Sequence, residues 1–338
     1  MKILIVGSDY QWSIERIYLR ELKAYGLDVD LFPAQNIFYD AYYKGIISKL
    51  LIRSGLINIY NKINKLLLEK VQQANYQLIW VFKGMEIFPS TLELLKKQKC
   101  KLINFNPDNP FIFSGKGSGN KNVTNSVSLF DIYLTYDKWV KEKIENDFKI
   151  RSELIPFVFD ENAILEDELT AIKEVNAVCF MGNPDAYRAK IILEILNCDL
   201  SIHLYGNKWD TFIQHPHAFI HRPVYGKDFL STLRKYRIQL NIMRAHNINS
   251  HNMRSVEIPG VGGLMLAPNT SDHKQFFTEG DDVFLFNDEK ELITKIREIL
   301  EMSEEKVRNI RMKAREKVLK EFTYSRQVNQ LIHLFSEI

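Results

Sequence analysis

Short runs of apolar residues recur along the first part of the chain and alternate with longer segments that have helical spacing. The apolar runs are 2–7, 28–32, 77–82, 101–105 and 131–136, and helical spacing is found in 11–26, 67–75 and 89–98. A strand that is apolar on both faces is covered on both sides, which is typical of a parallel sheet between helices. The pattern therefore predicts an α/β domain.

The same alternation begins again after residue 170. Further strands are expected at 176–182, 200–206, 218–222, 239–243, 263–267 and 282–286. Two such sheets predict two α/β domains, 1–157 and 158–322, whose strand carboxyl ends face a cleft. The remaining segment, 323–338, has the spacing of an amphipathic helix that Thr323 can cap. This helix either closes the second sheet or crosses back to the first domain.

Composition agrees with a soluble two-domain protein. The chain has 338 residues, of which 46% are hydrophobic and 26% charged. A net charge of +3 is too small to indicate nucleic-acid binding. The three cysteines have no metal-binding spacing and suit a reducing compartment. No apolar stretch is long enough to span a membrane, and residues 2–7 are too short for a signal-peptide core. We therefore expect a cytoplasmic protein.

Residues 249–269 combine polar side chains with a proline and several glycines. A helix that begins at Asn249 or Ser250 would place Ser250, Arg254 and Glu257 on one face. The Pro-Gly sequence would end it, and the later glycines would let the next backbone pass close to a ligand or a helix. Glu257 can accept hydrogen bonds from two ribose hydroxyls, while Arg254 or the helix amides can meet a phosphate. The alternative is an Arg–Glu pair within a solvated helix.

From residue 240 onward, the sequence resembles the C-terminal domain of GT-B glycosyltransferases, which have two Rossmann-like domains. It is most similar to the CgeB-like group, named after a spore-maturation protein. The motifs that carry the resemblance are Arg254 with Glu257, Gly262-Gly263, 272–276, 280–286 and, upstream, Gly182, Asn183 and Arg188. The resemblance covers roughly residues 100–300 and implies the GT-B fold and transfer of a sugar from a nucleoside-diphosphate sugar.

The resemblance also implies roles for single residues. Glu257 would bind the ribose hydroxyls, while Arg188, Arg254 and the amides at Gly182 and Asn183 would face the diphosphate. Other residues assigned to the donor site are Lys208 for a phosphate, Arg222 and Val224 for the base, and Ser250. Lys208 and Arg222 can equally be surface charges. Relatives with a paired-Glu donor motif have a second Glu where Ser250 stands, so this chain departs from that retaining pattern.

The first domain is expected to hold the acceptor and a general base. All 8 histidines lie at or after His203, so a base in this domain must be a carboxylate. Asp9, Glu86 and Asp108 each follow a predicted strand at its carboxyl end, where cleft residues belong. Asp108 is favoured because the similar group carries acidic residues in this loop. The alternative is that the residues around Asp108 form only a Pro/Asn/Asp turn.

Three other segments bear on the function. Residues 114–126 are rich in Gly, Ser, Asn and Lys and are expected to form a loop that closes over substrate. His215, His217 and His221 lack the carboxylate and helix context of a metal site, so the predicted chemistry is independent of metal. Residues 42–70 are basic and amphipathic. They predict either peripheral contact with a membrane or ordinary helices packed on the first sheet.

These observations favour a metal-independent glycosyltransferase of the EC 2.4 class. It would move a sugar from a nucleoside-diphosphate sugar, UDP-sugar by preference, to a glycan, lipid-linked or protein acceptor, without a separate cofactor. An alternative is a non-catalytic nucleotide-sugar-binding protein in a polysaccharide assembly complex. A dinucleotide-dependent dehydrogenase is disfavoured, because residues 7–13 contain no G-x-G-x-x-G sequence.

Overall fold

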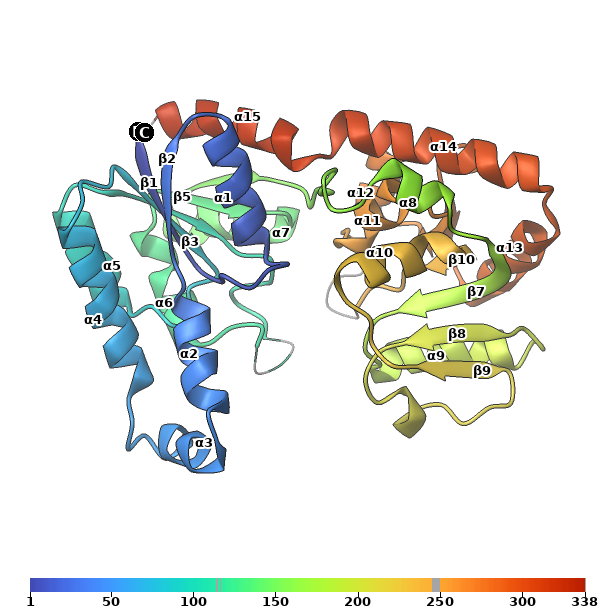
Figure 1. Ribbon diagram of the computed structural model, residues 1–338, viewed down its shortest axis with the longest axis horizontal. Helices are drawn as coiled ribbons and strands as arrows, with labels where there is room; N and C mark the ends of the chain where they lie inside the picture. The colour runs from blue at the N-terminus through green and yellow to red at the C-terminus, as the bar shows by residue number, and fades with distance from the viewer. Residues whose placement is uncertain (114, 116, 245–249, 338) are drawn as a thin grey trace. The chain divides into compact units, whose positions relative to one another are not determined.

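The chain folds into two compact units. The computed structural model describes residues 1–113, 115, 117–244 and 250–337. Unit 1 comprises Met1–Pro156 and Gln327–Ile338, and unit 2 comprises Phe157–Arg326. Each unit contains a six-stranded sheet with helices on its faces (Figure 1). All strand pairs are parallel, as expected for strands that are apolar on both faces.

The sheet of unit 1 has the strand order β2-β1-β3-β4-β5-β6. Its strands are β1 (Lys2–Val6), β2 (Asp28–Phe32), β3 (Leu78–Phe82), β4 (Lys101–Phe105), β5 (Ile132–Thr135) and β6 (Arg151–Leu154). Its helices are α1 (Ile14–Ala24), α2 (Ala34–Tyr43), α3 (Ile46–Arg53), α4 (Ile59–Gln72), α5 (Pro89–Lys97), α6 (Lys121–Ser126) and α7 (Lys138–Lys143), with short turns η1 (Val127–Leu129) and η2 (Ile144–Phe148).

Central strand β3 shows why this sheet is covered on both sides. Trp80 is fully buried and its ring contacts Tyr18 of α1 at 4.7 Å and Phe335 of α15 (Tyr324–Ser336) at 5.4 Å, measured between ring centroids. Ile79 and Val81 point to the other face and belong to a core cluster with residues of α4 and α5. An apolar residue is therefore needed at every position of the strand.

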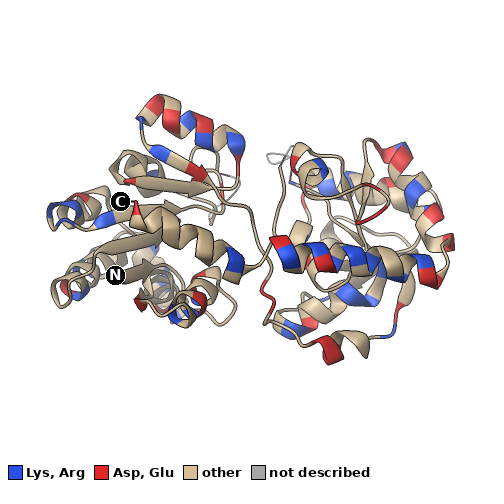
Figure 2. Cartoon of the chain, turned by 90° about the horizontal axis from the view of Figure 1, so that it is seen from above, with Lys and Arg blue, Asp and Glu red and all other residues tan. Residues whose placement is uncertain are grey.

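The final helix α15 packs with unit 1, although it follows the last helix of unit 2 in the chain. Thr323 caps it by accepting a hydrogen bond from the Arg326 amide at 3.4 Å. Val328, Leu331 and Phe335 are buried, and the Tyr18 hydroxyl donates to Gln327. Figure 2 shows α15 with few charges, whereas the preceding helix is banded with both signs. An apolar stripe thus docks α15 on the sheet.

The sheet of unit 2 has the order β12-β11-β10-β7-β8-β9. Its strands are β7 (Val175–Met181), β8 (Ile202–Tyr205), β9 (Ala218–His221), β10 (Tyr236–Leu240), β11 (Met265–Pro268) and β12 (Phe284–Phe286). Its helices are α8 (Glu166–Thr170), α9 (Ala186–Leu196), α10 (Gly226–Lys235), α11 (Arg254–Gly260), α12 (Ser271–Phe276), α13 (Glu289–Glu301) and α14 (Glu304–Glu321), with turn η3 (Trp209–Thr211). One core cluster joins this sheet to α9 and α13, including Phe180, Leu240, Ile192 and Ile296.

Two strands differ from the prediction, because charged residues interrupt the apolar pattern by which strands were identified. Strand β6 carries Arg151 and Glu153 at an edge of the sheet and was not predicted. Strand β10 begins at Tyr236, three residues before the predicted start, because it contains Arg237. That side chain is buried and its charge is balanced by Glu174 at 2.6 Å. A buried ion pair therefore lets a charged residue occupy a central strand.

The predicted loop 114–126 is helical in its second half. Helix α6 begins after Asn120, whose side chain accepts a hydrogen bond from the Val123 amide at 3.3 Å. Val123 and Ser126 are buried against the unit, which stabilises the helix. The prediction of a loop is therefore wrong for 121–126, while residues 114 and 116 lie outside the described residues. In the part of the chain that the structure describes, no helix is long and apolar enough to cross a membrane.

Candidate functional site

The order of strands in unit 2 predicts where a ligand binds. The chain passes from β7 to β8 and β9 on one side and then returns to β10 on the other side of β7. Such a switch point opens a crevice at the carboxyl ends of the two central strands, and open α/β sheets bind ligands there. The loops that follow β7 and β10 therefore form the candidate donor site.

Arg188 links these two loops. This α9 residue is buried, and its Nε and Nη2 donate to the Ile242 carbonyl after β10 at 3.2 and 3.0 Å. Its Nη1 donates to the Asn183 carbonyl after β7 at 3.1 Å. Burial lowers the pKa of the guanidinium to about 10, so it remains charged at neutral pH. A guanidinium has five N–H groups, and three of those of Arg188 make these hydrogen bonds to described residues.

Gly182 and Asn183 contact the loop after β8. The Gly182 carbonyl accepts a hydrogen bond from Trp209 Nε1 at 2.8 Å, and Asn183 Oδ1 accepts one from the Asn207 amide at 2.9 Å. A side chain at Gly206 would lie 2.3 Å from the Gly182 carbonyl oxygen, so glycine is required for the close approach. The structure thus brings Gly182, Asn183 and Arg188 together, beside the loop that carries exposed Lys208.

Arg222 and Val224 lie farther along the sheet. They follow β9, which is the edge strand two positions from β7. Arg222 is exposed, and Val224 is partly buried. They share the carboxyl edge of the sheet with the loops after β7 and β8, but none of the hydrogen bonds and ion pairs among the described residues joins them to Arg188.

Arg254 and Glu257 lie in α11, which follows β10. Arg254 Nη1 donates to the Glu257 carboxylate, so the intrahelical pair is present. The Arg254 guanidinium also lies 4.1 Å above the ring centroid of Phe229 in α10. The Glu257 side chain is 15% exposed, and a carboxylate has enough acceptor positions to bind further donors beside Arg254. The ion pair and ribose binding are therefore compatible.

The predicted start of this helix is wrong. Helix α11 begins at Arg254, so Ser250 is not on its face. Ser250 Oγ instead donates to Asp272 Oδ2 at 2.9 Å, and His251 Nδ1 lies 2.7 Å from the same oxygen. These contacts join the segment before α11 to the first turn of α12, whereas Asn249 lies outside the described residues. Ser250 is 8% exposed, and a role in donor binding stays a prediction.

The glycines after Glu257 close the helix. Gly262 has φ +69°, and its amide donates to the Pro259 carbonyl at 2.9 Å. The Gly263 amide donates to the Ile258 carbonyl at 2.8 Å. These two bonds form a Schellman motif, in which the left-handed residue favours glycine. Gly260 is also required, because a Cβ there would lie 2.6 Å from the Phe159 ring.

Substituting Gly263→Ala is expected to destabilise unit 2 by about 1–3 kcal/mol. The added Cβ would lie 2.7 Å from the Leu233 carbonyl oxygen and 2.9 Å from that of Ile258, and neither backbone atom can move freely. Gly45→Ala is the matched control, because nothing lies within 4 Å of its Cβ position. Denaturant unfolding of both variants measures the difference. Equal stability of the two would show that the turn after α11 is not tightly packed.

Unit 1 has its own switch point, between β1 and β3. Glu86 follows β3 and is 6% exposed, while Glu15 in the first turn of α1 is 5% exposed. The pKa of the Glu86 carboxyl is raised to about 7, chiefly by burial; the Glu15 carboxylate contributes to the rise, while a backbone hydrogen bond and Lys83 oppose it. Burial also raises the pKa of Glu15, whose Oε1 accepts the Ser8 amide at 2.9 Å. Two buried carboxyls thus follow the carboxyl ends of β1 and β3, and the charge of Glu15 acts on Glu86.

Sequence reasoning did not identify Glu15. Helix α1 begins shortly after β1, and Glu15 in its first turn is buried. A Cβ at Gly7 would lie 2.5 Å from Glu15 Oε1, so the glycine that follows β1 makes room for the carboxylate. The sequence feature that could have identified Glu15 is the Gly7-Ser8 pair after the strand, followed by an acidic residue in the first turn of the next helix.

The other two candidate bases are already paired with cations. Asp108 lies after β4 as expected, and its Oδ2 is 2.6 Å from Lys83 Nζ. The same ammonium donates to the Gly117 carbonyl at 2.7 Å. Asp9 follows β1 and forms an exposed pair with Arg16 at 2.9 Å. Neither carboxylate is as shielded from solvent as that of Glu86, which makes Glu86 the strongest of the three candidates on structural grounds.

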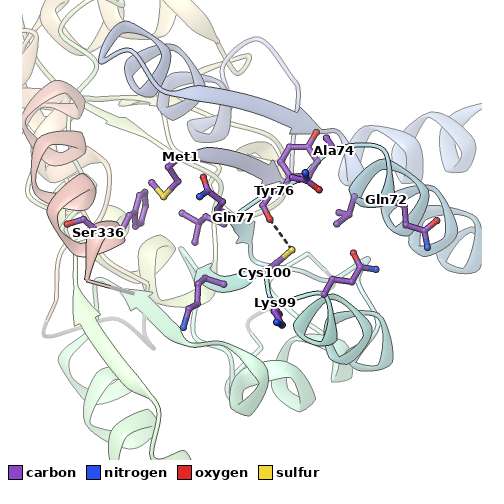
Figure 3. A pocket seen from close by; sticks show the side chains of 14 residues that line it. Met1, Gln72, Ala74, Tyr76, Gln77, Lys99, Cys100 and Ser336 are labelled. Atoms are coloured by element: carbon purple, nitrogen blue, oxygen red, sulfur yellow. Dashed lines mark hydrogen bonds between the residues drawn. The ribbon is translucent and has the colours of Figure 1, made fainter.

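A cavity of about 660 Å³ lies elsewhere in unit 1 (Figure 3). Its lining includes Met1, Gln77 and Lys101, which lie at the amino ends of β1, β3 and β4. This is the opposite edge of the sheet from Glu86, so the cavity is not the site that the strand order predicts. Among the described residues, no group of three or more His, Cys, Asp or Glu side chains is placed to hold a metal ion.

Comparisons with known proteins agree with this architecture. A family model described as glycosyl transferase-like matches residues 188–333. No curated protein matches the chain in sequence. A glycosyltransferase from Rickettsia africae is 13% identical, with 99% of this chain and 98% of that chain covered and a TM-score of 0.66. Anabaena HepE in complex with UDP is 14% identical, with 100% of both chains covered and a TM-score of 0.65.

Another similar structure is the sucrose-phosphate synthase of Thermosynechococcus elongatus. It is 12% identical, covers 100% of this chain and 98% of its own, and has a TM-score of 0.68. Identities this low establish the arrangement of the backbone and not the reaction. The chain therefore has the GT-B fold of glycosyltransferases, with two Rossmann-like units, and its residues 188–333 match the glycosyl transferase-like family model.

Proposed function

We propose that the protein is a glycosyltransferase that uses a nucleoside-diphosphate sugar, with a UDP-sugar as the favoured donor. The observation that carries the proposal is the switch point of unit 2, where Arg188 links the loops that follow β7 and β10, and where α11 with Glu257 comes after β10. The match to the glycosyl transferase-like model supports it. The HepE structures with UDP and with UDP-glucose support the choice of donor. The narrower relation to the CgeB-like group stays a prediction.

The proposed donor site divides into three parts. Glu257 accepts hydrogen bonds from the two ribose hydroxyls, and its pair with Arg254 fixes the direction of the carboxylate. Arg188 and the main-chain amides after β7 meet the diphosphate. The remaining residues assigned to the donor are Lys208 for the second phosphate and Arg222 and Val224 for the base. No step requires a separate cofactor.

Unit 1 is proposed to bind the acceptor and to supply the base. In an inverting reaction, Glu86 takes the proton of the acceptor hydroxyl while that oxygen forms a bond to the anomeric carbon. The bond from that carbon to the diphosphate breaks, and the nucleoside diphosphate leaves with both electrons. A pKa of about 7 suits a base at neutral pH, because the proton is accepted readily and the ionised form is still present. The acceptor is a glycan, a lipid-linked glycan or a protein.

Two measurements test the proposal. Thermal-shift screening against UDP, GDP, dTDP, CMP and NAD identifies the nucleotide, and stabilisation is expected with a uridine nucleotide. Stabilisation by NAD alone would favour a dehydrogenase. Release of UDP from a UDP-sugar then separates an enzyme from the second candidate function, a non-catalytic nucleotide-sugar-binding protein. That candidate is favoured by Ser250, which stands where relatives with a paired-Glu motif have a second carboxylate.

EDTA is expected to leave the transfer rate unchanged. The developing charge on the leaving diphosphate can be balanced by Arg188, Lys208 and the amides at the start of α9. Rates measured with EDTA and with added Mg²⁺ or Mn²⁺ check this expectation, with a commercially characterised metal-dependent transferase as the positive control. A strict requirement for a divalent ion would contradict the proposed role of these basic groups.

A further inference from the structure

Residues 43–57 of unit 1 expose large apolar side chains. Ile46 is 79% exposed, Ile47 74% and Leu56 77%. Tyr43, Leu50 and Ile57 are exposed as well. Helix α3 contains no buried residue, and Figure 1 shows it at the ends of α2 and α4, away from the sheet of its unit. In an ordinary surface helix the apolar stripe faces the core. The exposed stripe of α3 therefore indicates a surface that binds a partner or a membrane.

The helix is nevertheless held in a defined position. Ile52 packs against the core cluster of unit 1, and Arg53 Nε donates to the Tyr42 hydroxyl at 2.7 Å. The Lys49 ammonium lies 5.2 Å from the ring centroid of Tyr42. Ile46 and Leu50 are one turn apart, so they form one outward stripe together with Ile47. The exposed surface is therefore presented by a folded segment and not by a loose tail.

The charges around this stripe have a single sign. Between residues 41 and 68 the sequence contains no Asp or Glu. The basic residues in this range are Lys44, Lys49, Arg53, Lys62 and Lys65. Helix α4, in contrast, buries its own apolar positions Ile59, Ile63 and Leu67. Helix α4 therefore packs on its unit as the alternative expected, whereas α3 leaves most of its apolar side chains exposed.

We propose that α3 with its flanking residues 43–57 docks on the surface of an anionic lipid bilayer. The apolar side chains of Ile46, Ile47 and Leu50 enter the boundary between headgroups and acyl chains, and the surrounding lysines and arginine contact the anionic headgroups. Tyr43 lies at the level of the headgroups, where amphipathic rings are favoured. Burial of the apolar stripe in the bilayer favours binding, and the lysines and arginine around it attract lipids of negative charge.

The charges also decide between a bilayer and a second copy of the chain. A two-fold interface would place the same surface on both partners, so the basic residues of one copy would face those of the other. Like charges brought together in this way oppose association. An anionic lipid surface is complementary to the same residues. The inference does not depend on the proposed transfer reaction, because binding can be measured without any substrate.

Flotation of the full chain with vesicles tests the proposal. Vesicles of phosphatidylcholine with about one-third phosphatidylglycerol are compared with pure phosphatidylcholine, and binding to the anionic vesicles alone is expected. Raising the salt to about 1 M should lower binding at least several-fold, since it screens the headgroup charges. Binding to neither vesicle would overturn the proposal, as would equal binding to both.

Two sets of variants separate the contributions. The first variant replaces the apolar stripe and carries Ile46→Glu, Ile47→Glu and Leu50→Glu. The second removes the basic residues and carries Lys44→Gln, Lys49→Gln and Arg53→Gln. Each variant is expected to reduce the bound fraction at least tenfold. The matched control carries glutamate at exposed leucines in other helices and should bind like the wild type. Its positions are Leu94, Leu193 and Leu319.

Thermal unfolding confirms that each variant is folded before its binding is compared. Unchanged vesicle binding in both α3 variants would overturn the proposal. Sedimentation of the wild type without lipid supplies a further check. If it shows a concentration-dependent dimer that the glutamate substitutions at Ile46, Ile47 and Leu50 abolish, a second copy is the occupant and the lipid proposal is wrong.

Discussion

Glu86→Gln is expected to lower kcat of sugar transfer by about 10²–10⁴-fold, the usual contribution of a general base, while the affinity for the donor stays unchanged. Glutamine has nearly the same shape but accepts no proton. The carboxyl it replaces is 6% exposed, so the substitution removes a buried ionisable group without opening a cavity. Steady-state kinetics with a UDP-sugar and separate calorimetry of UDP binding distinguish the two effects.

The dependence of this reaction on pH follows from the same group. Burial raises the pKa of Glu86 to about 7, so the carboxylate that accepts the proton forms as the pH rises through 7. We expect kcat/KM to increase with pH across this range, because kcat/KM reports the ionisations of the free enzyme. In Glu86→Gln the residual activity should lose this dependence.

Variants of the other acidic residues complete the test. Asp108→Asn and Asp9→Asn are expected to retain more activity, because both carboxylates already pair with a cation. If Asp108→Asn lowers kcat and Glu86→Gln does not, the base is the residue that the sequence favoured. If Glu15→Gln alone is inactive, the base is the other buried carboxyl of unit 1. Near-normal activity in all four variants would indicate a retaining reaction, which the anomeric configuration of the product then settles.

Glu257→Ala is expected to weaken the binding of UDP and of UDP-sugar by about ten- to hundredfold. Two hydrogen bonds from ribose hydroxyls to a carboxylate contribute roughly 1.5–3 kcal/mol. Arg254 should stay in place, because its guanidinium also lies against Phe229. Calorimetry gives the affinities, and thermal unfolding without ligand should show little change, since the lost ion pair is worth only tenths of a kcal/mol.

Glu166→Ala is the matched control for this substitution. Glu166 also pairs with an arginine of unit 2, Arg315, but it lies in α8 and has no assigned role in donor binding. Its removal should leave the affinity for UDP unchanged. If Glu257→Ala binds UDP as tightly as this control, Glu257 does not hold the ribose, and the intrahelical pair with Arg254 is its whole role.

The alternation of apolar and helical segments was enough to predict both sheets except for the edge strand β6. Strands such as β3 are apolar at every position because both faces are covered, and this pattern is visible in the sequence. The predicted start of β10 was too late, because Arg237 is buried in the strand only through its ion pair with Glu174, which is distant in the sequence. The start of α11 was missed because Ser250 binds Asp272 across the fold and does not cap the helix. Contacts distant in sequence cannot be read from local spacing.

The same limit explains why only part of the candidate site could be predicted from the sequence. Residues after strands, such as Asn183 and Glu86, can be placed at a carboxyl edge from the strand pattern alone. Their partners cannot, so the sequence favoured Asp108 without showing its pair with Lys83. The inward direction of Glu15 depends on the space at Gly7, which only the folded chain reveals.

A crystal structure of the protein soaked with UDP and UDP-sugars tests the central claim most directly. The account predicts a uridine nucleotide at the carboxyl ends of β7 and β10, with both ribose hydroxyls bonded to the Glu257 carboxylate. It also predicts the diphosphate within hydrogen-bond distance of Arg188 or of the amides after Gly182. A nucleotide bound at another place, such as the cavity at the amino ends of β1, β3 and β4, would contradict the account. So would an unoccupied crevice at ligand concentrations that saturate binding in solution.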